Sequence, residues 1–132
     1  MQRILVIDDE PYVIEALQRV LGGPTVAVLG AADAAAGLAE LSKSPVDIAI
    51  VDVILPGMDG VAAIKAMRCE HPDLKIIAIS GGGNFGLSEY QPEAISTSAY
   101  LAACRSAGAD GTLAKPFETA ELRALIGQVE AA

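Results

Sequence analysis

The stretch VDIAIVDVILPGMDG, residues 46–60, joins an uninterrupted apolar run to an acidic residue and then to a loop. The run at 48–51 is apolar at every position, which is typical of a central strand buried on both faces of a parallel sheet. Asp52 follows the run directly, and the Pro, Gly and Asp residues of 56–60 indicate a loop. The stretch therefore predicts a buried strand that ends in a carboxylate.

Outward from this strand, short apolar runs alternate with longer amphipathic segments. Such alternation is typical of β-α-β units, in which helices cover both faces of a parallel sheet. We expect strands at 4–7, 25–29, 48–51, 76–79 and 112–114, and helices at 12–21, 32–41, 61–69 and 118–129. The pattern predicts a single α/β domain, a doubly wound sheet of five parallel strands with helices on both faces.

Polar residues follow four of these apolar runs. Asp8 and Asp9 follow the first, Asp52 the third, Ser80 the fourth and Lys115 the last. The carboxyl ends of parallel strands meet at one edge of the sheet, where such folds bind ligands. Three clustered carboxylates repel one another unless a divalent cation joins them, and their oxygens suit Mg²⁺. With an ammonium and a hydroxyl beside them, the predicted site is suited to phosphoryl chemistry.

The composition narrows the class of protein. The 132 residues carry a formal charge of −8, which argues against nucleic acid as a partner. No stretch approaches the ~20 apolar residues of a membrane span, and the first residues show no signal-peptide cleavage pattern. Cys69 and Cys104 lack metal-ligand spacing, so we expect reduced thiols. These features predict a cytoplasmic protein that binds neither nucleic acid nor membrane.

The site residues and their neighbours match a known pattern. The matching pieces are Asp8-Asp9-Glu10, the segment 51–60, Ser80, the segment 108–110 and Lys115-Pro116-Phe117. In this order and spacing they resemble the response-regulator receiver domain of two-component signalling, over nearly the whole chain. The resemblance implies a flavodoxin-like sheet of strand order 2-1-3-4-5. It also implies a signalling domain that catalyses only its own phosphorylation and dephosphorylation.

The resemblance assigns a role to each site residue. Asp52 would be the phosphoacceptor, taking a phosphoryl group from a sensor histidine kinase, a histidine phosphotransfer protein or a small donor such as acetyl phosphate. Mg²⁺, or Mn²⁺ in its place, would be held directly by Asp9, Asp52 and the backbone carbonyl of Ile54, and by Asp8 through water. Ser80 and Lys115 would contact the phosphoryl group. The Lys115–Pro116 peptide bond would be cis.

The end of the chain bears on how a signal would leave the domain. No residues of this sequence remain for an output domain after 130–132. If the chain is the whole gene product, we expect a stand-alone receiver over residues 1–132; if it is part of a longer protein, the output domain lies outside it. Phosphorylation would then change the conformation of this domain and its binding to a downstream protein target.

Two features depart from the receiver pattern. The position three before Lys115, where many receivers carry an aromatic switch residue, is Thr112, which offers no ring to bury. The stretch from Ser80 to Lys115 exceeds the family habit by roughly a dozen residues, and loops of that size are often functional. We expect the glycine-rich segment 81–92, rather than position 112, to respond to phosphorylation. The alternative is a longer fourth helix with a flexible lead-in.

Other interpretations remain open for single residues and for the whole chain. Asp9 before Glu10 could be a helix cap, Lys115 a solvated side chain and Ser80 part of a loop. The chain could be a phosphorylation-independent pseudo-receiver, although such domains usually lack one of the five site residues. It could be a small Mg-dependent phosphotransferase-like enzyme, although such enzymes usually carry an Asp two residues after the nucleophile. This chain has Ile54 there.

Overall fold

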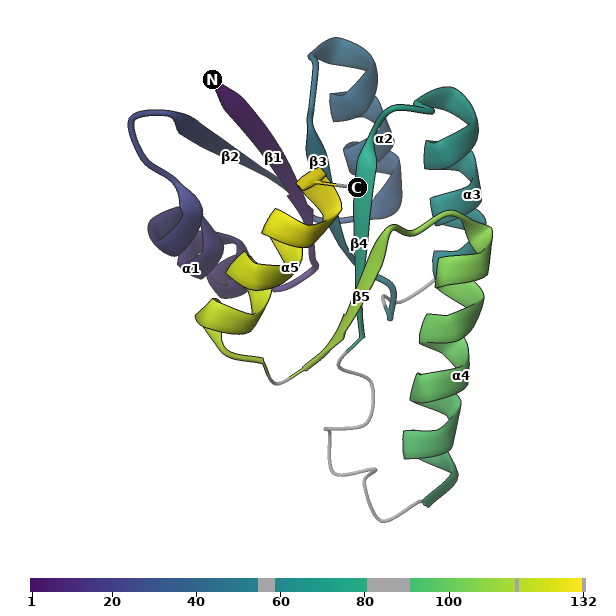
Figure 1. Cartoon of the computed structure of the whole chain (residues 1–132). Helices are drawn as coiled ribbons and strands as arrows, with labels where there is room; N and C mark the ends of the chain where they lie inside the picture. The colour runs from purple at the N-terminus through teal and green to yellow at the C-terminus, as the bar shows by residue number, and fades with distance from the viewer. Residues whose placement is uncertain (55–58, 81–90, 116, 132) are drawn as a thin grey trace.

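The computed structural model describes residues 1–54, 59–80, 91–115 and 117–131, without the side chains of 91–98. Strands and helices alternate along the described chain. They are β1 (Gln2–Ile7), α1 (Pro11–Leu21), β2 (Val26–Ala31), α2 (Ala34–Lys43), β3 (Ile48–Asp52), α3 (Gly60–Glu70), β4 (Lys75–Ser80), α4 (Gln91–Ala107), β5 (Gly111–Ala114) and α5 (Thr119–Ala131). The strands form one parallel sheet in the order β2-β1-β3-β4-β5 (Figure 1). The predicted fold class and strand order are confirmed.

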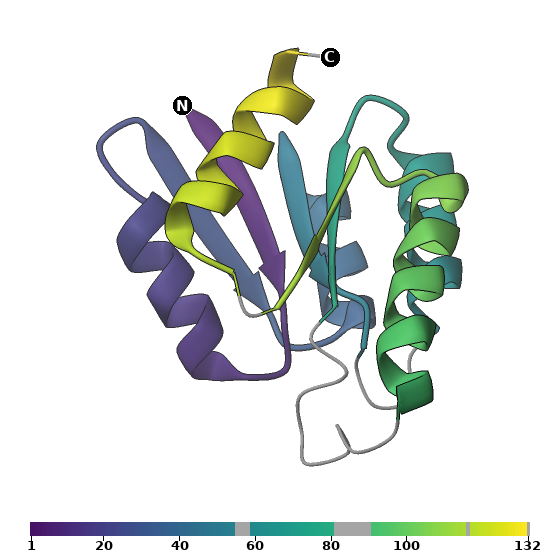
Figure 2. The same ribbon diagram turned by 60° about the horizontal axis from the view of Figure 1, so that its bottom comes forward.

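The helices cover the sheet on both faces, with α1 and α5 on one side and α2, α3 and α4 on the other (Figures 1 and 2). Each face has its own apolar core. One core joins Leu5 and Val51 to buried side chains of α2, α3 and α4, and the other joins Val6 and Ile50 to α1 and α5. All five residues of β3 are buried, as its apolar run predicts.

The helix starts follow local side-chain chemistry. Pro11 is the first residue of α1, a position where its missing N–H costs nothing. The second helix was expected from residue 32, but it begins at Ala34 because Asp33 caps it. The Asp33 carboxylate accepts a hydrogen bond of 2.7 Å from the N–H of Ala36. A capping carboxylate thus outweighs the helix preference of the preceding alanine.

One arginine ties together the turns that lead into β4 and β5. Arg68 of α3 donates to the carbonyls of Pro72 and Leu74 before β4, and to that of Gly108 before β5. Its guanidinium also lies 2.6 Å from the carboxylate of Asp110. Gly108 has φ +135°, a conformation that favours glycine. This network holds the amino-terminal ends of two neighbouring strands in register.

The two cysteines are free. Cys69 is exposed on α3, and Cys104 is buried in α4 within the core on that side. No helix among the described residues is both long and apolar enough to cross a membrane.

Candidate functional site

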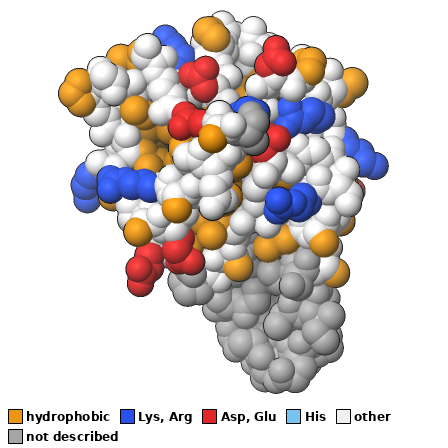
Figure 3. Space-filling model, in the orientation of Figure 1, with side chains coloured by type: hydrophobic (Ala, Val, Ile, Leu, Met, Phe, Trp, Pro, Cys, Tyr) orange, Lys and Arg blue, Asp and Glu red, His pale blue; other side chains and the backbone are white. Residues whose placement is uncertain are grey.

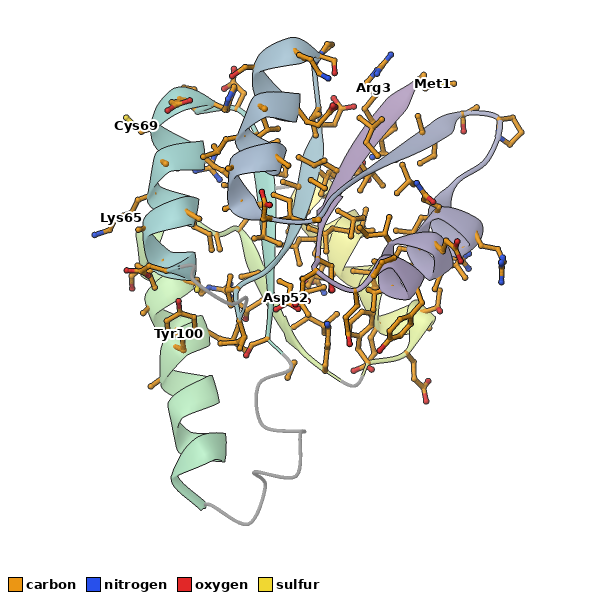
Figure 4. The ribbon with its side chains drawn as sticks, turned by 180° about the vertical axis from the view of Figure 1, so that it is seen from behind. Met1, Arg3, Asp52, Lys65, Cys69 and Tyr100 are labelled. Atoms are coloured by element: carbon orange, nitrogen blue, oxygen red, sulfur yellow. The ribbon has the colours of Figure 1, made fainter. Side chains whose placement is uncertain are left out.

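Four strands of the sheet deliver side chains to its carboxyl edge. Asp52 is the last residue of β3 and Ser80 the last of β4, while Asp8 and Lys115 come directly after β1 and β5. The backbone N–H of Lys115 donates to the carbonyl of Ser80 at 2.9 Å, which places these two residues side by side. Figure 4 shows Asp52 at the end of the sheet opposite to Met1. The convergence predicted from the sequence is therefore observed.

Lys115 bridges two of the carboxylates. Its Nζ lies 3.1 Å from Oδ2 of Asp8 and 3.1 Å from Oδ2 of Asp52. Asp8 is 3% exposed and Asp52 is 7% exposed, so both ion pairs are largely withdrawn from water. A single ammonium thus holds two buried carboxylates that would otherwise repel each other.

Backbone amides orient the same two carboxylates. The N–H of Glu10 donates to Oδ1 of Asp8 at 2.9 Å, and the N–H of Ile54 donates to Oδ1 of Asp52 at 2.9 Å. Each carboxylate therefore has one oxygen on a local backbone N–H and the other on Lys115. Hydrogen bonds to an ionised acceptor are among the stronger kinds, so the rotamers of both side chains are well defined.

A third carboxylate completes an acidic cluster. Asp8, Asp9 and Asp52 each offer an oxygen atom, and these oxygens lie within 4.8 Å of one another. Asp9 is exposed, in contrast to its two partners. Hard oxygen donors at this spacing fit a divalent cation such as Mg²⁺, which commonly binds through a few carboxylates and keeps several waters. The residues present therefore fit the cation that the sequence predicts.

Burial and charge act in opposite directions on the ionisation of this site. Burial raises the pKa of Asp52 above its ordinary value, the Ile54 hydrogen bond and the Lys115 charge lower it, and the Asp8 charge raises it again. The net direction is upward. Burial lowers the pKa of Lys115, but the charges of Asp52 and Asp8 outweigh it, so this pKa lies above its ordinary value. The lysine is therefore cationic at neutral pH, whereas the aspartate resists ionisation while no metal is bound.

Ser80 brings an unused hydroxyl to the same edge. It is 1% exposed, and its Oγ has no hydrogen-bond partner within the part of the chain that the structure describes. A buried hydroxyl without a partner is costly, so such a group calls for an explanation. A group bound at the edge of the sheet would supply the missing acceptor.

Of the remaining residues that the sequence singles out, some are described by the structure and others lie outside the described residues. Thr112 lies on β5, pairs with Ala78 of β4 and is partly buried. The Ile54 side chain is 44% exposed beside the cluster. Pro116, and with it the predicted cis peptide bond, lies outside the described residues. Most of the segment 81–92 does so as well, because residues 81–90 are not described.

One contact near the site could not be predicted from the sequence. The hydroxyl of Tyr100 on α4 accepts a hydrogen bond from the N–H of Gly60, at the start of α3. The two residues are 40 positions apart, and neither carries a motif that would pair them. An aromatic residue on an otherwise alanine-rich helix was the only signal available.

Comparisons with known proteins agree with this geometry. A sequence model of the response regulator receiver domain family matches residues 4–127. The transcriptional regulatory protein PrrA of Mycobacterium tuberculosis is 32% identical over 124 residues, which make up 94% of this chain and 48% of PrrA. The DNA-binding transcriptional regulator NtrC of Escherichia coli is 30% identical over 130 residues, or 96% of this chain and 24% of NtrC.

Solved structures show the same fold. The chemotaxis protein CheY4 of Vibrio cholerae has a TM-score of 0.75 and 27% identity, covering 98% of both chains. The response regulator TrrA of Thermotoga maritima, in complex with Mg²⁺-BeF, has a TM-score of 0.73 and 26% identity, covering 98% of this chain and 99% of TrrA.

The matched family and the five strand-end residues define the class of protein. The chain belongs to the response regulator receiver domain family of two-component signalling. Receiver domains are signalling domains rather than enzymes of the ordinary kind. The chain spans about half of PrrA and about a quarter of NtrC, so what those whole proteins do is not carried over to it.

Proposed function

We propose that this domain accepts a phosphoryl group on Asp52. The observation that carries the proposal is the position of Lys115, whose Nζ lies 3.1 Å from both Asp8 and Asp52 at the edge of a three-carboxylate cluster. A buried carboxylate of this kind is a nucleophile that needs no general base once it is ionised. The ammonium beside it offers a cation to the incoming phosphoryl oxygens.

The proposed step is a transfer between two partners. An oxygen of the Asp52 carboxylate attacks the phosphorus of a phosphohistidine on a histidine kinase or phosphotransfer protein. A P–O bond forms, the P–N bond breaks, and the imidazole leaves with the bond electrons and takes a proton from water. The products are an aspartyl phosphate and a neutral histidine. With acetyl phosphate as donor, the leaving group is acetate.

The metal requirement follows from the donor set. Asp8, Asp9 and Asp52, with the backbone carbonyl of Ile54, would hold Mg²⁺, and Mn²⁺ could replace it. Bound there, the cation would neutralise the negative charge that otherwise keeps phosphate away from the cluster. Lys115 would bind a phosphoryl oxygen, and the hydroxyl of Ser80, which has no partner among the described residues, would donate a hydrogen bond to another.

The partners follow from this chemistry. Relatives in the family are partnered by histidine kinases, and we assign the same kind of donor to this chain. The output would be altered binding of a downstream protein target. On the face that carries α1 and α5, Lys and Arg side chains are spread singly among acidic ones (Figure 3), unlike the continuous basic surface of a nucleic-acid binder. The stand-alone arrangement stays a prediction, tested by the mass of the protein in the cells that make it.

Intact-mass spectrometry with acetyl phosphate tests the phosphoacceptor. We expect the wild-type chain to gain one phosphoryl group in Mg²⁺ and none in excess chelator. Asp52→Asn should gain none, because its amide is not a nucleophile. Asp47→Asn is the matched control, since Asp47 is exposed before β3 and its amide oxygen could still accept from the Arg3 N–H. It should be phosphorylated as the wild type is.

Two results would overturn the proposal. One is an adduct that forms equally on Asp52→Asn, which would place the phosphoryl group elsewhere. The other is the absence of any adduct from both acetyl phosphate and a phosphorylated histidine phosphotransfer protein, which would favour a phosphorylation-independent pseudo-receiver.

A further inference from the structure

Tyr100 of α4 lies against the first turn of α3. Its hydroxyl oxygen accepts a hydrogen bond of 2.8 Å from the backbone N–H of Gly60, the first residue of α3. Tyr100 is partly buried and Gly60 is buried. Figure 4 shows Tyr100 on α4 at about the same level as Asp52. A side chain of one helix thus holds the backbone at the start of the next helix along the sheet.

This hydrogen bond completes the cap of α3. The first N–H groups of a helix have no partner within it. The carboxylate of Asp59 accepts hydrogen bonds from the N–H groups of Val61 and Ala62, at 3.1 and 3.3 Å. The carbonyl of Asp59 accepts one from the N–H of Ala63. The N–H of Gly60 is left over, and Tyr100 accepts from it. The amide at the start of α3 therefore depends on the position of α4.

Gly60 in turn lies against the residue that follows Asp52. A Cβ at position 60 would meet Val53 Cβ at 2.5 Å, the Val53 carbonyl oxygen at 2.7 Å and the Tyr100 hydroxyl at 3.0 Å. Val53 is 1% exposed, and its N–H donates to the carbonyl of Ile79 on β4. Packing this tight transmits displacement, because a shift of one group has no free space to absorb it. A chain of direct contacts therefore runs from Asp52 through Val53 and Gly60 to Tyr100.

We infer that Tyr100 is a positioning residue for the phosphoacceptor, and that its hydroxyl couples the position of α4 to the phosphorylation of Asp52. This rests on the function proposed above. Coupling of this kind is reciprocal: if the Tyr100 hydroxyl stabilises one state of the site more than the other, its loss must change the affinity of the site for a phosphoryl mimic.

Carbon-13 NMR of the tyrosine rings tests the first half of this inference. The chain has three tyrosines, so Tyr12→Phe and Tyr90→Phe variants assign two of the ring signals and leave that of Tyr100 by elimination. The sample is the wild-type chain, titrated with Mg²⁺ and beryllofluoride. Fluorine-19 NMR of the bound beryllofluoride reports occupancy of the site in the same sample. We expect the Tyr100 signal to move in step with this occupancy.

The affinity for beryllofluoride in saturating Mg²⁺ tests the second half. Tyr100→Phe keeps the ring and removes the hydroxyl, and we expect it to change this affinity by about fivefold or more. Arg123→Ala controls for lost stability alone, because it removes a side-chain hydrogen bond of 2.7 Å to the Val20 carbonyl at the far end of α1. This control should bind beryllofluoride as the wild type does.

The possible results distinguish a failure of the Tyr100 inference from a failure of the proposed phosphorylation of Asp52. A Tyr100 signal that stays still while Asp52 is phosphorylated would overturn the inference and leave the proposed function intact. So would a Tyr100→Phe variant that unfolds more easily but keeps the wild-type affinity, because the hydroxyl would then be only a cap. Failure of wild-type phosphorylation would overturn both. The ring measurement uses the wild-type chain, so the test holds even if Tyr100→Phe does not fold.

Discussion

At the scale of single residues, Asp52 is a carboxylate in an environment that resists its charge. It is 7% exposed, and two further carboxylates lie close to it. Lys115 and the N–H of Ile54 compensate only in part, so burial leaves the pKa of Asp52 raised. At neutral pH the charge of the buried Asp52 carboxylate is therefore unfavourable in the metal-free domain. The same burial holds this nucleophile beside Lys115.

This raised pKa predicts how stability depends on pH in metal-free buffer. Because the pKa of Asp52 is higher in the folded state, the folded chain binds more protons, and the free energy of unfolding falls as the pH rises through that pKa. Asp52→Asn should therefore be more stable than the wild type at about pH 7, with a gain that shrinks toward about pH 4. Urea unfolding in chelator measures the difference.

The control for this experiment is Asp47→Asn, an exposed change at the opposite edge of the sheet, which should show no such gain. A constant gain across the pH range would mean that the charge of Asp52 is not its source. If Asp52→Asn were less stable than the wild type at about pH 7, the charge of Asp52 would stabilise the folded state rather than destabilise it.

At the scale of elements, two helical glycines have opposite surroundings. Gly37 of α2 is buried, and a Cβ there would lie 2.3 Å from Ile7 Cδ1 and 2.9 Å from Ile7 Cγ1. Gly127 of α5 is exposed, and apart from its chain neighbours and the adjacent backbone of its own helix no described atom lies within 4 Å of a Cβ built on it. The first glycine lets a helix approach the sheet closely, whereas the second only weakens its helix.

Alanine at the two positions should therefore have opposite effects. Gly127→Ala should raise the free energy of unfolding by about 0.5–1 kcal/mol, because alanine loses less backbone entropy in a helix. Gly37→Ala should lower it by about 1–2 kcal/mol, because overpacking a filled core outweighs that gain. Urea midpoints at constant m-value measure both changes. Stabilisation by both substitutions would show that α2 moves away from Ile7 at little cost.

At the scale of the whole molecule, the doubly wound sheet makes a site that no single element contains. Asp8, Asp52, Ser80 and Lys115 come from the ends of four strands and are up to 107 residues apart in sequence. The apolar cores on the two faces hold those strands in register, and so hold the carboxylates together before any ligand binds. A cation that joins the carboxylates should therefore stabilise the whole fold.

Mg²⁺ should raise the free energy of unfolding of the wild-type chain by about 2.7 kcal/mol at a hundredfold excess over its dissociation constant. Asp9→Asn removes the exposed carboxylate of the cluster and should lose most of this gain. Asp47→Asn should keep it. Thermal melts at several Mg²⁺ concentrations make the measurement, and equal stabilisation of Asp9→Asn and the wild type would place the cation elsewhere.

Much of this molecule could be predicted from its sequence. Buried parallel strands require apolar runs, so the run at 48–51 marked β3 and the residue after it marked the site. The alternation of runs and amphipathic segments predicted the α/β class, and the strand-end positions predicted which side chains would meet. The start of α2 was misplaced by two residues because the cap by Asp33 competes with the helix preference of alanine.

The tertiary structure alone decided which groups touch within that edge. Lys115 could have pointed to solvent, but packing of the sheet places its Nζ between Asp8 and Asp52 at 3.1 Å from each. The bond from Gly60 to Tyr100 likewise depends on how closely α4 packs beside α3. Hydrophobic periodicity and composition act over a few neighbouring residues. They therefore determine the helices and strands, and which side chains lie at the carboxyl edge of the sheet. Contacts between distant side chains depend on packing in three dimensions, which no local pattern encodes.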